Sequence, residues 1–149
     1  MRRDYVSLDV RNTDEGDEQP AAVLTFDGPA EVLEERLANT EGEPLDREDV
    51  DVAFRYQTAV DADEATGVFS LAHRVTGDFV LEVNADADRV LDLVTAARDG
   101  ETDGEGRYRV VVRRDNEDVA VYEKRTLLVY DDEGGLLRGH SLIPSGVEL

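Results

Sequence analysis

Apolar and polar residues alternate along much of the chain with the period of two that predicts half-buried β-strands. The clearest example is Val52, Phe54 and Tyr56, which fall on one face of a predicted strand. Turn residues such as Thr76-Gly77-Asp78 separate neighbouring segments of this kind. The pattern predicts strands over residues 4–11, 21–27, 50–58, 67–75, 79–84, 108–114, 119–130 (as one bent strand or two) and 136–142.

Two helices are predicted between these strands. The first begins at Pro29, whose fixed φ suits a first turn, and ends near Asn39. The second is capped by Asn84 or Asp86 and ends at Gly100, a common helix stop. The apolar stripes of the two helices consist of Val32, Leu33 and Leu37, and of Val90, Leu91, Val94 and Ala97.

These elements predict an α+β fold in a single domain over residues 1–149, with a largely antiparallel sheet and both amphipathic helices on one face of it. The order strand, cap, helix, acidic loop, strand occurs in 24–57 and again in 81–114, each time after another strand. This order suggests an internal ββαβ duplication followed by a C-terminal hairpin. Independent elements fit nearly as well, because the two halves share few identical residues.

Charge is the unusual feature of the composition. The chain carries a formal net charge of −20, and its basic residues are fifteen arginines and a single lysine, Lys124. This pattern is typical of proteins that work in molar salt, where a screening length of about 3 Å suppresses repulsion between carboxylates. A disordered acidic segment is disfavoured by the periodic apolar residues. A mimic of nucleic acid is disfavoured because the carboxylates cluster in loops.

The chain lacks the residues that several functional classes require. The chain has no cysteine, so thiolate catalysis, disulfides and cysteine-based metal sites are excluded. Its two histidines show no metal-ligand spacing. His140 and Ser141 are neighbours on a predicted strand, where we expect them to point to opposite faces. We expect no catalytic residues, no metal and no cofactor. Without a long apolar run or a signal segment, we also expect no membrane association and a cytoplasmic location.

The C-terminal part of the chain is the least acidic. Residues 1–106 hold 28 acidic and 9 basic side chains, whereas residues 107–149 hold 8 and 7. Arg107, Arg109 and Arg113 fall on one face of a predicted strand, with Val111 among them. These arginines either protect the edges of the sheet from pairing with other strands and form ion pairs with carboxylates, or they form a binding surface. The candidate binding residues are Lys124, Arg125, Arg138 and His140.

Short segments along the whole chain carry a resemblance to a known family. They are RRDY at 2–5, FDGPAE at 26–31, DVAFR at 51–55, VTGD at 75–78, YEKRT at 122–126 and SLIPSGVEL at 141–149. The sequence resembles an uncharacterised family of haloarchaeal proteins, a domain of unknown function. The resemblance implies a salt-rich habitat and transfers no activity, ligand or catalytic residue.

The sequence therefore favours a salt-adapted interaction module without catalytic activity. Its partner would be another protein or a second copy of the chain, bound through the less acidic C-terminal strands. The alternative is a small enzyme or metabolite-binding protein with a site near Arg138 and His140. Nucleic acid is disfavoured as a partner, because molar salt nearly abolishes purely electrostatic phosphate binding.

Overall fold

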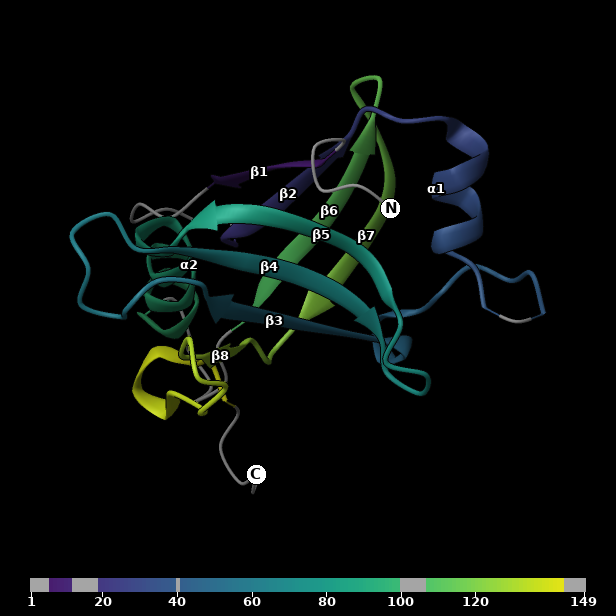
Figure 1. The fold of residues 1–149 in the computed structure, drawn as a ribbon. Helices are drawn as coiled ribbons and strands as arrows, with labels where there is room; N and C mark the ends of the chain where they lie inside the picture. Colours follow the sequence, from purple (N-terminus) through teal and green to yellow (C-terminus); the bar gives the residue numbers. More distant parts are fainter. Residues whose placement is uncertain (1–5, 12–18, 40, 100–106, 144–149) are drawn as a thin grey trace.

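Strands form most of the regular structure in the computed structural model, which describes residues 6–11, 19–39, 41–99 and 107–143 (Figure 1). The described elements follow the predicted order up to residue 130. They are β1 (Val6–Arg11), β2 (Ala21–Phe26), α1 (Ala30–Arg36), the 3₁₀ turn η2 (Arg47–Asp49), β3 (Val50–Tyr56), β4 (Thr66–His73), β5 (Phe79–Asp86), α2 (Ala87–Asp99), β6 (Tyr108–Arg114), β7 (Glu117–Lys124), β8 (Leu128–Tyr130) and the 3₁₀ turn η3 (Arg138–His140).

The strands form two four-stranded sheets. One has the order β1-β2-β6-β7 and the other β5-β4-β3-β8. Only the β2–β6 and β3–β8 pairs are parallel, so both sheets are mostly antiparallel. The predicted α+β class is confirmed, whereas the expectation of one sheet is wrong. Periodicity identifies the strands but carries no information about which strands pair.

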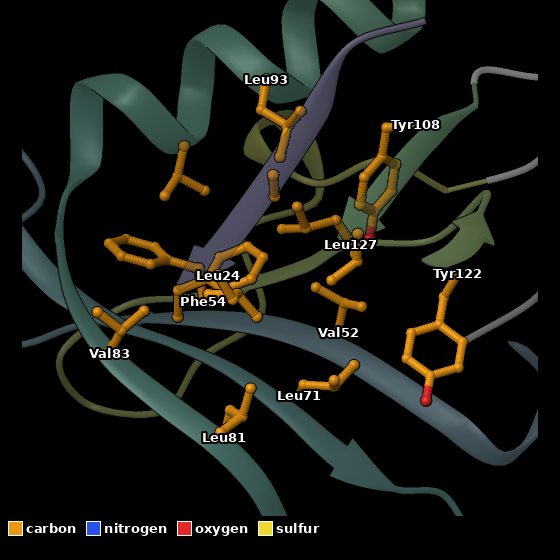
Figure 2. Close-up of a cluster of buried hydrophobic side chains, with 14 of the residues drawn as sticks. Leu24, Val52, Phe54, Leu71, Leu81, Val83, Leu93, Tyr108, Tyr122 and Leu127 are labelled. Carbon is orange, nitrogen blue, oxygen red and sulfur yellow. The ribbon is translucent and has the colours of Figure 1, made fainter. Parts of the chain in front are cut away.

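The core lies between the two sheets, which face each other (Figure 1). The predicted inward face of β3 is confirmed, because Val52, Phe54 and Tyr56 are all buried. Figure 2 shows Leu24 from one sheet and Leu71 from the other within the same cluster of apolar side chains. Burying a large aliphatic or aromatic side chain contributes about 1.5–3 kcal/mol. The mutual cover of the two inner faces is thus the main stabilising feature of the fold.

The helices lie at opposite ends of the two facing sheets (Figure 1). The prediction that both helices cover one face of a single sheet is therefore wrong. Helix α2 packs against β1 and β5 through Val90, Leu93 and Val94, which are buried. Helix α1 is short and buries Leu33. Because the sheets already cover each other, only the ends of the core remain for helices to close. Among the residues that the structure describes, neither helix has the length and apolar character of a membrane span.

The predicted ββαβ order does occur twice, but the two halves differ in how their strands pair. Strand β3, the last of the first half, joins the sheet that contains β4 and β5 of the second half. Strand β6, the last of the second half, joins the sheet that contains β1 and β2 of the first half. Strand β3 pairs with β4 in antiparallel orientation, whereas β6 pairs with β2 in parallel orientation. The element order is therefore repeated without a repeated pairing scheme.

The C-terminal hairpin takes a form that the sequence did not predict. Segment 119–130 is two strands in different sheets, and residues 136–142 are not a continuous strand. Two isolated β-bridges, Tyr130–Leu136 and Leu127–Leu142, and hydrogen bonds such as that from the Leu137 amide to the Val129 carbonyl link this segment to the chain before it. Ser141 is buried, accepts a hydrogen bond from the Val129 amide at 2.9 Å and donates one to the Leu137 carbonyl at 2.7 Å. These bonds favour the turn η3 over an extended strand.

Gly67 tests the close packing of β3 on β4. A β-carbon at this position would overlap the carbonyl oxygen of Arg55 and lie 2.7 Å from the Phe54 ring. We predict that Gly67→Ala lowers the free energy of unfolding by about 1–3 kcal/mol, as overpacking does in cores. Denaturant unfolding at constant salt measures the change. Gly139→Ala is the control, because its β-carbon would meet nothing within 4 Å. Equal stabilities of the two variants would contradict the prediction.

Candidate interaction surface

The outer face of the β1-β2-β6-β7 sheet is formed by alternate residues of its strands. In β6, Tyr108, Val110 and Val112 are fully buried in the core. Strand geometry therefore places Arg109, Val111 and Arg113 on the opposite face. This agrees with the predicted arginine face of the strand.

An apolar row crosses the middle of this outer face. Val23 of β2, Val111 of β6 and Val121 of β7 are direct neighbours in the strand register. Val23 and Val111 are buried, whereas Val121 is 51% exposed and Val119 beside it is 44% exposed. We call Val23, Val111, Val119 and Val121 the outer valine surface. Its exposed part lies on β7, the edge strand of the sheet.

Charged residues flank the outer valine surface on both sides. Arg109 lies opposite Glu123 in the register, and the Arg113 Nε is 2.8 Å from a carboxylate oxygen of Asp118. A guanidinium nitrogen of Arg107 is 3.9 Å from a carboxylate oxygen of Glu123. The Nε atoms of these three arginines are buried, which indicates that their side chains lie along the sheet. The carboxylates of β7 thus largely neutralise these three arginines.

Lys124, one of the predicted binding residues, lies inside the protein. It is 7% exposed, and its Nζ donates hydrogen bonds to the carbonyls of Arg47 at 2.8 Å and Val50 at 2.7 Å. Burial lowers the pKa of its ammonium group, and the nearby Arg74 adds to this shift. On the same inner side of β7, burial raises the pKa of Tyr122 to about 12. Lys124 therefore fastens β7 to η2 and β3 and is not available to an external ligand.

The other predicted binding residues are distributed over two elements. Arg125 is exposed directly after β7, whereas Arg138 and His140 belong to η3, which packs on β8. Arg138 is exposed, and the His140 ring is tilted against Tyr56 with 6.4 Å between the ring centroids. The four candidate residues do not form one exposed cluster, because Lys124 points into the core.

A polar groove of about 400 Å³ lies where β1 meets the ends of β4 and β5 and the start of α2. Arg89 in this groove donates a hydrogen bond to the Val10 carbonyl at 2.7 Å, so it already ties α2 to β1. Sequence analysis missed the groove, because its residues come from five segments without a common motif. It includes neither Arg138 nor His140. Its lining consists of Leu8, Gln57, Thr66, Asn84, Ala85, Asp86 and Arg89.

The described part of the chain contains no group of three or more histidine, aspartate or glutamate side chains that could hold a metal ion. The outer valine surface is more distinctive than the groove, because it combines exposed valines, an edge strand and charges that are nearly balanced. These features make it the candidate functional site.

The fold and this surface define an α+β protein of two facing sheets with an apolar patch on an edge strand. The chain belongs to the family of unknown function DUF5793, whose family model matches residues 1–149. Comparisons with curated proteins and with solved structures found no match.

Lys124→Met tests whether the lysine is structural. The variant keeps an apolar side chain as far as Cε but removes the ammonium group and leaves two carbonyls without their charged donor. Hydrogen bonds to charged groups contribute about 1.5–3 kcal/mol. We predict a loss of that size in the free energy of unfolding, measured by denaturant titration. Arg125→Met, at the exposed neighbouring position, should change stability by less than about 0.5 kcal/mol. A Lys124→Met protein as stable as Arg125→Met would show that the buried ammonium group contributes little.

Proposed function

We propose that this protein is a non-catalytic interaction module that binds a protein partner through the outer valine surface and the edge of β7. The exposure of Val119 and Val121 beside the buried Val111 and Val23 carries this proposal. Exposed valines on an edge strand favour aggregation, so natural proteins usually avoid them unless a partner covers them.

The charges around the outer valine surface support a protein partner. An apolar centre with a rim of arginines and carboxylates is the usual composition of a protein–protein interface. Its exposed valines, Val119 and Val121, lie within residues 107–149, which hold 8 acidic and 7 basic side chains in a protein with a net charge of −20. Approach of another acidic protein is therefore opposed less here than elsewhere.

The proposed site retains only some of the residues that the sequence indicated. Arg125 follows directly on β7 and belongs to the proposed surface, whereas Lys124 supports it from inside. Arg138 and His140 belong to the alternative, a small-molecule site, and the polar groove does not include them. Nucleic acid remains a disfavoured ligand, because Glu123 and Asp118 lie against the arginines that would bind phosphate.

We further propose that the protein is adapted to concentrated salt in a haloarchaeal cytoplasm. The support is the net charge of −20 with fifteen arginines and a single lysine, which is buried. In dilute buffer the carboxylates repel one another over a screening length that molar salt reduces to about 3 Å.

The proposed salt adaptation predicts a melting temperature that rises steeply between about 0.1 M and 2 M KCl, over which the screening length falls from about 10 Å to below 3 Å. Differential scanning fluorimetry or calorimetry measures it. Sucrose of equal osmolality is the control, because it strengthens burial without screening charge. An equal melting temperature in dilute and concentrated KCl would contradict the adaptation.

Val121→Lys tests the proposed binding surface. The protein and its variants would be used to capture partners from a native lysate in molar KCl. Val75→Lys is the matched control, since Val75 is 93% exposed in the turn between β4 and β5. We predict that partners captured by the unmodified protein and by Val75→Lys are lost with Val121→Lys. Undiminished capture by Val121→Lys would refute the assignment.

A further inference from the structure

Strand β7 is an outer strand whose second edge is not paired with any described strand. Strands β1 and β5, the outer strands at one side, lie against each other. Strand β8, at the far edge of its sheet, has three residues and packs against η3. Strand β7 has eight residues, with β6 on one side and no strand among the described residues on the other.

The sequence of β7 is polarised in charge along its length. It begins with Glu117 and Asp118, whereas at its other end Glu123, which lies 3.9 Å from Arg107, is followed by Lys124 and Arg125. Two copies of such a strand attract each other when they run antiparallel, because the acidic start of one faces the basic end of the other. In a parallel pair, like charges would lie opposite each other, which is destabilising.

We propose that the edge of β7 pairs with β7 of a second copy of this chain, antiparallel and centred on Val121. This inference rests on the proposed function of the outer valine surface and identifies the partner as the protein itself. Centring on Val121 places the two Val121 side chains opposite each other and each Val119 opposite Glu123 of the other copy. Directly opposite residues of an antiparallel pair share one face of the sheet.

The pairing continues the apolar row of each copy across the dimer axis. Val23, Val111 and Val121 of one copy and the same three residues of the other form one uninterrupted row on an eight-stranded sheet. The interface is isologous and closes on itself, so it produces a dimer and not a fibre.

A bulge limits the length of the pairing. The β6–β7 register shifts between Val112 and Arg113, which leaves Val119 as the extra residue of β7. Bulges reduce the capacity of an edge for pairing, so among the positions that face each other in this register only residues 120–122 lie in the regular part of both strands. This short interface predicts a weak dimer. Since each copy carries a charge of −20, the dimer also requires salt.

Disulfide trapping tests the register directly, because the chain has no cysteine of its own. Val121→Cys would place two thiols opposite each other across the axis, within the Cα separation of about 4.4–6.8 Å that a disulfide needs. Mild oxidation in about 2 M KCl, where the screening length is below about 3 Å, should convert most of this variant to covalent dimer. Val75→Cys, 93% exposed in the turn between β4 and β5 and outside β7, is the control and should remain monomeric.

A mixed pair of variants tests the orientation. Val119→Cys and Glu123→Cys should each cross-link poorly alone and efficiently when mixed, because the antiparallel register places these positions opposite each other. Efficient cross-linking of each alone would indicate a parallel or different arrangement and would overturn the proposed pairing.

The oligomeric state of the unmodified protein completes the test. Sedimentation equilibrium at up to about 1 mM protein, which detects complexes as weak as millimolar Kd, should show a dimer fraction that rises with KCl and disappears in Val121→Lys. A monomer under all these conditions would overturn the inference. If Val121→Lys then still abolishes capture of another protein, the proposed function stands without the dimer; if capture is also unchanged, both fall.

Discussion

The fold depends on the mutual burial of the inner faces of two four-stranded sheets. Neither sheet could exist alone, because each presents a row of large apolar side chains such as Phe54 and Leu24 that must be covered. The two sheets are also linked through the chain. Strand β3 follows β1 and β2 in sequence but pairs in the other sheet, and β6 follows β4 and β5 but pairs in the sheet of β1 and β2. Separation of the sheets would therefore expose the core and break strand pairing in both halves.

Because the two sheets cover each other's inner faces, most charged residues are restricted to the surfaces that remain in contact with water. Apolar residues occupy the inner faces, and α1 and α2 close the ends of the core. Most carboxylates are left for loops and helix surfaces, whereas the outer face of β6 and β7 carries arginines paired with Glu123 and Asp118. The part of the surface with the most balanced charge is thus also the part with exposed valines, and this coincidence underlies the proposed interface.

Lys124 illustrates how one side chain can hold such an arrangement. Its ammonium group bridges from the edge strand of one sheet to one carbonyl in η2 and one at the start of β3 in the other sheet. Burial of a charge is costly, and here two carbonyl acceptors offset the cost. The bridge keeps β7 in place on its inner side while the outer side of the same strand remains exposed.

The sequence by itself determined the strands up to residue 130, the two helices and the arginine face of β6, because alternation and helical spacing record which side of each element meets water. It also indicated the part of the chain with the most balanced charge. Only the tertiary structure decided that the strands divide between two sheets, that Lys124 points inward and that Ser141 converts an expected strand into the turn η3. The physical reason is that periodicity describes the two faces of a single strand, whereas pairing, edge position and burial depend on neighbours that lie far away along the chain.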